Sequence, residues 1–122
     1  KMLGGELLEN SFWTNLREHR LSFFKSYEHI WRVSLPINSA PLNLPGHQLI
    51  DWGGAQRWLR SDEDPHVIRK AVTQLGGHAT QYALGESSFH PLPATLMRYH
   101  KRLKNQFDPQ NIFNPGRMYA EV

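Results

Sequence analysis

The 122-residue sequence contains no cysteine, which excludes disulfide bonds, Cys-ligated zinc and Cys-ligated iron–sulfur clusters. It has no apolar run near the roughly 18 residues of a membrane-spanning helix, and its first ten residues lack the apolar core of a secretion signal. Neither sign of charge dominates, because 14 Lys and Arg face 11 Asp and Glu. Nucleic-acid-binding domains typically concentrate basic residues in a stripe, which this near-balanced charge does not indicate. We therefore expect no nucleic-acid partner.

The usual catalytic motifs are also missing. No two of the seven histidines are three or four residues apart, the spacing that helical metal sites use, so we expect no metal site. The sequence has no G-x-S-x-G elbow of a serine hydrolase and no glycine fingerprint of a dinucleotide site or P-loop. Catalytic residues therefore stay unknown at the level of motifs.

What is present favours a folded domain. Aromatic residues make up 11% of the chain and include four Trp, which argues against disorder. The length suits one domain over residues 1–122. Because the chain opens with Lys1 and not with Met, and ends abruptly at Val122, we expect it to be a piece of a longer protein.

The N-terminal half predicts a helix, a strand and a hairpin. Asn10 or Ser11 can cap a helix to about Arg20. Residues 30–35 alternate in polarity and predict a strand. Residues 36–47 hold three prolines, which leave room for at most a short helical turn.

The segment QLIDWGGAQRWL, residues 48–59, predicts a hairpin that turns at Gly53-Gly54. A two-residue loop pairs Asp51 with Gln56 and Ile50 with Arg57. Trp52, Ile50 and Arg57 should then lie together on one face of the sheet.

The C-terminal half predicts a helix at 64–75, stopped by Gly76-Gly77, then a strand at 78–83 and a long helix to about Phe107. The element order indicates an α+β fold. We expect a ferredoxin-like, or split βαβ, antiparallel sheet with helices mainly on one face, plus N- and C-terminal helices and an irregular tail. Such a sheet keeps a second face for water, another domain or a ligand.

Three strings of residues go beyond fold class: QLIDWGGAQRWL, then GGHAT, and finally FDPQNIFNPGR. Together they resemble the C-terminal part of the FAD-binding subunits of bacterial glycolate oxidases, within the FAD-linked oxidases that have a vanillyl-alcohol-oxidase-type flavin domain. The resemblance covers about residues 11–119.

This resemblance implies a role in a larger flavoenzyme. The chain would be the cap and C-terminal segment of a subunit whose N-terminal FAD domain is absent from this sequence. The full complex would hold a related flavin subunit and an iron–sulfur subunit, and would oxidise glycolate to glyoxylate. It would be cytoplasmic, at the inner face of the membrane through the complex. We expect FAD in the full-length protein and none in this chain alone.

A 2-hydroxy acid is an anion, and a guanidinium can clamp its carboxylate with two hydrogen bonds. Arg32, Arg57 and His78, with Thr80, could share the open sheet face, so the first three are the candidate substrate-binding residues. As an alternative, each arginine stacks on a tryptophan or pairs with an acidic residue, and His78 binds backbone groups at the helix end.

The resemblance also turns the tail toward the flavin, where Asn114 and Arg117 would be its polar contacts in the full-length protein. A turn that only pins the tail explains the same residues.

Three functions stay open: the cap of a 2-hydroxy-acid oxidase subunit, a structural subunit without its own turnover, and a free-standing ferredoxin-like ligand-binding module. We also expect the isolated chain to form a homodimer through exposed apolar residues, among them Ile50, Trp52, Phe113 and Met118.

Overall fold

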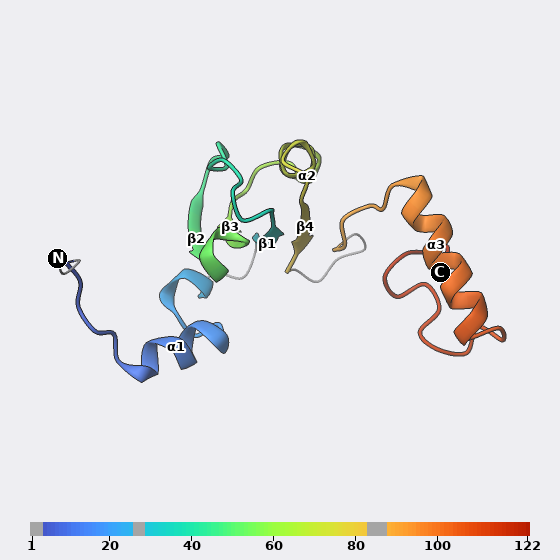
Figure 1. Ribbon diagram of the computed structural model, residues 1–122, viewed down its shortest axis with the longest axis horizontal. Helices are drawn as coiled ribbons and strands as arrows, with labels where there is room; N and C mark the ends of the chain where they lie inside the picture. The colour runs from blue at the N-terminus through green and yellow to red at the C-terminus, as the bar shows by residue number, and fades with distance from the viewer. Residues whose placement is uncertain (1–3, 26–28, 83–87) are drawn as a thin grey trace.

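The computed structural model describes residues 4–25, 29–82 and 88–122. Its centre is a four-stranded antiparallel sheet in the order β2-β3-β1-β4. The strands are β1 (Ile30–Ser34), β2 (His47–Asp51), β3 (Gln56–Arg60) and β4 (His78–Gln81). The helices are α1 (Asn10–Arg17), α2 (Pro65–Gln74) and α3 (Ala94–Phe107), as Figure 1 shows. The predicted α+β class with an antiparallel sheet is confirmed.

The connection between β1 and β2 replaces the first helix of a split βαβ unit. β3 lies between β1 and β2, and β1 lies between β3 and β4, which is the interleaving that a split βαβ requires. Pro36, Pro41 and Pro45 lack the N–H that a helix needs, and Leu42 and Leu44 of the connection pack on the core instead. The strand order is therefore compatible with the ferredoxin-like description, which stays a prediction.

Both faces of the sheet carry apolar residues. On one face α2 covers the larger core, which consists of Trp31, Val33, Leu35, Leu42, Leu59, Ile68, Val72 and Ala79. On the other face Phe24, Ile30 and Trp58 form a smaller cluster against residues of the N-terminal segment. α1 and α2 accordingly lie on opposite sides of the sheet (Figure 1). The N-terminal segment thus closes part of the face that a ferredoxin-like sheet leaves open.

The hairpin has the predicted register and a longer loop. Asp51 pairs with Gln56, and Ile50 pairs with Arg57. The strands stop there because Trp52 has a φ of 50°, and Gly53 and Gly54 continue the turn with φ of 61° and 95°. Four residues, and not two, therefore connect β2 to β3.

α1 ends three residues earlier than the predicted Arg20. His19 has a φ of 55°, which is outside the helical region. Its ring lies 4.7 Å from that of Phe24 and 4.6 Å from that of Trp58, measured between centroids. Packing of the His19 ring into the smaller cluster therefore competes with continuation of the helix.

α2 begins and ends where the sequence predicts. The Asp64 carboxylate accepts a hydrogen bond from the N–H of His66 over 2.7 Å, and Pro65 occupies the first turn. Gly76, with a φ of 77°, donates to the carbonyl of Thr73 and ends the helix.

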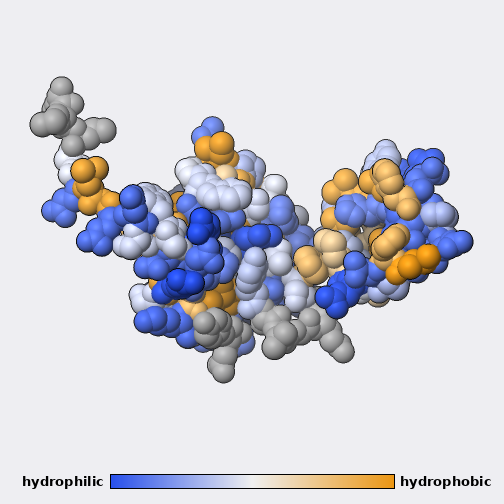
Figure 2. Space-filling model, turned by 90° about the horizontal axis from the view of Figure 1, so that it is seen from below, coloured by the Kyte–Doolittle hydropathy of each residue, from blue (hydrophilic) through white to orange (hydrophobic). Residues whose placement is uncertain are grey.

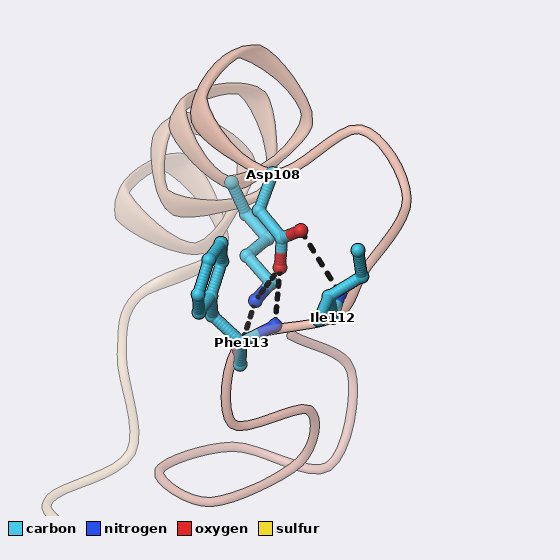
Figure 3. Close-up of polar contacts among 4 residues, drawn as sticks. Asp108, Ile112 and Phe113 are labelled. Atoms are coloured by element: carbon cyan, nitrogen blue, oxygen red, sulfur yellow. Dashed lines mark hydrogen bonds and ion pairs between the residues drawn. The ribbon is translucent and has the colours of Figure 1, made fainter.

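The tail after α3 is held by Asp108. Its carboxylate accepts hydrogen bonds from the N–H groups of Ile112 and Phe113, both over 2.9 Å, and an ion pair from Lys104 over 2.6 Å (Figure 3). Lys104 also donates to the carbonyl of Phe113. These contacts fold the tail back beside α3 without burying its apolar side chains.

α3 and the tail present exposed apolar residues. None of the α3 residues is buried, and Figure 2 shows apolar residues gathered on this end of the molecule. The exposed set is Leu96, Tyr99, Leu103, Phe107, Ile112, Phe113 and Met118. Among the described residues, no helix is both long and apolar enough to cross a membrane.

Candidate functional site

A cleft runs along the outer edge of β4. It has a volume of about 910 Å³ and lies between α2, β4, the segment 89–93 and the tail residues Met118 and Tyr119. This volume is at the upper end of the range for small-molecule sites.

His90 forms hydrogen bonds with three of the elements that surround this cleft: β4, α2 and the tail. Its Nδ1 accepts a hydrogen bond from the backbone N–H of Ala79 in β4, over 3.2 Å. Its Nε2 lies 3.1 Å from the hydroxyl of Thr73 in α2, and its carbonyl accepts from the Tyr119 hydroxyl over 3.2 Å. One residue therefore connects the sheet edge, α2 and the tail.

The hydrogen bond from Ala79 determines the protonation state of His90. A neutral imidazole whose Nδ1 accepts must carry its proton on Nε2, so Nε2 donates to Thr73. Burial, with the nearby charges of Arg69 and His78, lowers the pKa of His90 below its ordinary value. The ring is therefore neutral at pH 7.

Two further side chains stabilise the walls. Arg69 donates to the carbonyl of Phe89 over 3.1 Å, and its guanidinium lies 5.5 Å from the ring centroid of Trp31. Burial raises the pKa of Tyr119 above its usual value, so its phenol stays a hydrogen-bond donor to His90.

The cleft is electropositive. Its basic lining residues are Arg32, His66, Arg69, Lys70, His78 and His90, and no Asp or Glu is among the described residues that line it. The remaining wall is largely apolar and includes Phe89, Leu92 and Leu96. Such a lining suits an anion with an apolar part.

The structure brings together two of the three predicted substrate-binding residues. Arg32 pairs with Thr80, and Ser34 pairs with His78, so these side chains share the sheet face opposite α2. Arg32 and His78 are both exposed, and both line the cleft. The Arg32 guanidinium lies 5.7 Å from the ring centroid of Tyr82, so this arginine stacks on a tyrosine and not on a tryptophan.

The expectation that Arg57 shares this face is wrong. Arg57 pairs with Val33, which points toward α2, and it is only 4% exposed. Its guanidinium donates to the carbonyls of Ser39 and Ala40, both over 2.8 Å, and to that of Gly54 over 3.2 Å. Arg57 thus joins the proline-rich connection to the hairpin turn. Among the described residues it stacks on no tryptophan and pairs with no carboxylate.

Asn114 and Arg117, the predicted flavin contacts, lie on a turn of the tail. Asn114 has a φ of 46°, and its carbonyl accepts from the N–H of Arg117 over 3.3 Å. Both residues are exposed, and neither lines the cleft. The turn leaves them available to another part of a longer protein.

The glycines among the described residues form no cradle for the phosphates of FAD. Gly53 and Gly54 build the hairpin turn, and Gly76 ends α2. Cβ atoms at Gly77 would overlap the carbonyl oxygen of Ser34, so Gly77 allows close packing on β1. The residues described here therefore fit at most the edge of a flavin site. Within the same ranges, no group of three His, Asp or Glu residues could hold a metal ion.

His90, Thr73 and Asp108 were not among the functional residues predicted from the sequence. His90 lies in the irregular segment that precedes α3 and is followed by Pro91 and Pro93. No periodic pattern therefore predicts its place beside β4. Thr73 is recognisable only as part of the polar side of α2. Asp108 had a usable signal, since Lys104 precedes it by four residues and Pro109 follows it.

The chain is 50% identical over all of its 122 residues to the glycolate oxidase subunit GlcE of Escherichia coli (strain K12). It covers 35% of that protein and therefore spans about a third of the length of this curated relative. No protein-family model and no solved structure matches the chain. The identity confirms the resemblance to a glycolate oxidase subunit that the sequence motifs indicated.

Proposed function

We propose that this chain is the cap and C-terminal part of the FAD-binding subunit of a glycolate oxidase. In the full complex this enzyme would oxidise glycolate to glyoxylate. The observation that carries the proposal is the 50% identity, over the whole chain, to a subunit named for that activity.

The proposal includes the surroundings of the chain. Its partners would be the FAD domain of the same protein, a related flavin subunit and an iron–sulfur subunit, assembled at the cytoplasmic face of the membrane. The exposed turn with Asn114 and Arg117 would contact the flavin from the tail side. That the relative is itself a subunit supports an assembly of this kind.

Oxidation of a 2-hydroxy acid removes two electrons and two protons from the carbinol, and bound FAD would supply the electron acceptor. The part of this chain would be to hold the anion. Arg32 can clamp the carboxylate by two parallel hydrogen bonds, and His78 lies on the same face beside it. The described lining of the cleft holds no carboxylate, and Arg32 forms no ion pair with any described residue, which supports this assignment.

The test is glycolate turnover by the full-length subunit, alone and in the complex, with an artificial electron acceptor. Arg32→Met should raise the KM for glycolate at least tenfold, because a charge-assisted bidentate contact is lost. Arg20→Met removes an exposed arginine outside the cleft and is the matched control. Unchanged KM in Arg32→Met and in His78→Gln would overturn the substrate-binding assignment.

A structural role is a second candidate, favoured by the exposed apolar side of α3. In that case the full-length subunit would not oxidise glycolate alone, while removal of the subunit would abolish turnover by the complex. Turnover by the isolated full-length subunit would exclude a purely structural role.

A further inference from the structure

α2 carries a polar stripe on the side away from the core. Residues three and four apart lie above one another on a helix, and this spacing connects four residues of α2 that all line the cleft. They are His66, Arg69, Lys70 and Thr73. The apolar residues Ile68 and Val72 of the same helix are fully buried against the sheet. The stripe is therefore the wall that α2 contributes to the cleft.

The Thr73 hydroxyl in this stripe is oriented by His90. Because His90 accepts from Ala79 at Nδ1, its Nε2–H donates to the Thr73 oxygen. A hydroxyl that accepts in this way keeps its own hydrogen for another acceptor. Residues 4–25, 29–82 and 88–122 offer no side-chain or backbone acceptor for that hydrogen, and Thr73 is exposed to the cleft. The chain of hydrogen bonds thus ends in a donor that points away from His90.

Two basic residues flank this donor. Lys70 lies three residues before Thr73, and His66 lies seven residues before Thr73. Both are therefore on the same stripe, and both are exposed. Neither forms an ion pair with an acidic side chain among the described residues. Across the cleft lie the apolar side chains of Leu92, Leu96 and Met118.

From this arrangement we propose that the α2 wall is an anion subsite: the Thr73 hydroxyl and Lys70 bind a carboxylate or phosphate group whose apolar or aromatic body packs on the opposite wall. The cleft volume of about 910 Å³ leaves room for a ligand much larger than a two-carbon acid. Arg32 and His78 line the same cleft from the sheet face opposite α2, so the proposed subsite uses other residues and does not rest on the proposed turnover.

The experiment is a calorimetric titration of the full-length protein with phenyl phosphate, phenylacetate and benzyl alcohol. The first two probes carry the two candidate anions on one aromatic body, and the third is neutral. We expect saturable binding of at least one anion and binding of benzyl alcohol at least tenfold weaker. The preferred anion then identifies the group as phosphate or carboxylate.

Variants locate the binding. Lys70→Met and Thr73→Val should each weaken the preferred anion about tenfold, since each removes a hydrogen bond to a charged group. Lys101→Met, an exposed lysine of α3 that does not line the cleft, is the matched control and should bind normally. Lys70 is exposed, so its variant keeps the test valid if Thr73→Val unfolds.

The proposal is overturned if no anion binds saturably, or if Lys70→Met binds as the unchanged protein does. Arg32→Met should keep the binding of the preferred probe while losing glycolate affinity. The two proposals can therefore fail independently.

Discussion

The backbone N–H of Ala79 donates to Nδ1 of His90 over 3.2 Å, across the outer edge of the sheet. Ala79 is fully buried, whereas the segment around His90 has no regular structure of its own. Ser88 strengthens this junction, because its carbonyl accepts from the N–H of Gln81 over 2.8 Å. The two bonds satisfy donors of an edge strand that would otherwise be open to another chain.

Acid should therefore loosen this edge. A protonated His90 cannot accept from Ala79, and its folded pKa is below the value of about 6.5 in an unfolded chain. Between these two pKa values the unfolded state binds more protons, so the free energy of unfolding falls as pH drops below about 6.5. Urea unfolding at several pH values between 5 and 8 measures the slope.

His90→Asn keeps an acceptor near the position of Nδ1 and cannot titrate, so this contribution to the slope should vanish. His90→Phe should lower the free energy of unfolding by about 1–2 kcal/mol at pH 7 through the lost hydrogen bond. The exposed His47, on the far strand of the sheet, supplies the control His47→Asn. An unaltered slope in His90→Asn would contradict the assignment.

Asp108 makes the tail sensitive to stronger acid. Its hydrogen bond with Lys104 and those from the N–H groups of Ile112 and Phe113 lower the pKa of this carboxyl to about 2. A depressed carboxyl pKa stabilises the folded state above the unfolded value of about 3.9, and the contribution is lost as pH falls from there to about 2. Hydrogen exchange of the Ile112 and Phe113 amides should therefore accelerate across this window. Asp108→Asn should already show fast exchange at pH 7, whereas Asp62→Asn, at an exposed loop, should not.

Arg57 should contribute to stability and not to substrate affinity. Arg57→Met removes a buried guanidinium that donates to three partly buried carbonyls, and we expect it to lower the free energy of unfolding by about 1–3 kcal/mol. Arg20→Met should change stability by less than about 0.5 kcal/mol. Chemical denaturation compares the two; equal stabilities would show that the guanidinium contacts are not formed in solution.

Helix ends and the hairpin register could be predicted from the sequence, but the sheet face on which a strand residue lies could not. Local signals located α2, because Asp64 and Pro65 start it and Gly76 ends it. The hairpin register followed from the Gly53-Gly54 turn. The face on which Arg57 lies depends on its pairing with β1, which is remote in the sequence, and no local pattern encodes that register.

The candidate site depended even more on remote contacts. Alternation within each strand only allowed Arg32 and His78 to share a face, and it is the pairing of β1 with β4 that brings them together. His90 reaches the same cleft from an irregular segment, and hydrogen bonds with Ala79, Thr73 and Tyr119 hold it there. An irregular segment has no hydrophobic periodicity, so its contacts with remote elements cannot be predicted from a sequence pattern.

Gly77 is a sharp test of the packing between β4 and β1. A Cβ at this position would overlap the carbonyl of Ser34 and a methyl group of Leu35, so the backbone must shift. Gly77→Ala should therefore lower the free energy of unfolding by about 2–3 kcal/mol. Thermal unfolding measures the effect. Gly5→Ala, where a Cβ meets no neighbour, should leave the melting temperature unchanged. Equal melting temperatures would mean that this end of β1 is packed differently.

The apolar side of α3 should make the isolated chain self-associate. Phe107 is 83% exposed and Phe113 is 67% exposed, so folding of the tail beside α3 leaves both in water. Two copies that pair through a two-fold axis could cover this surface, and sedimentation over a concentration series should show a monomer–dimer equilibrium. Leu103→Glu places a charge within the apolar side and should shift the equilibrium to monomer, whereas Lys101→Glu, on the opposite side of the helix, should leave it in place. If the chain stays monomeric at high concentration, the apolar side of α3 does not bind a second copy, and the homodimer proposal fails.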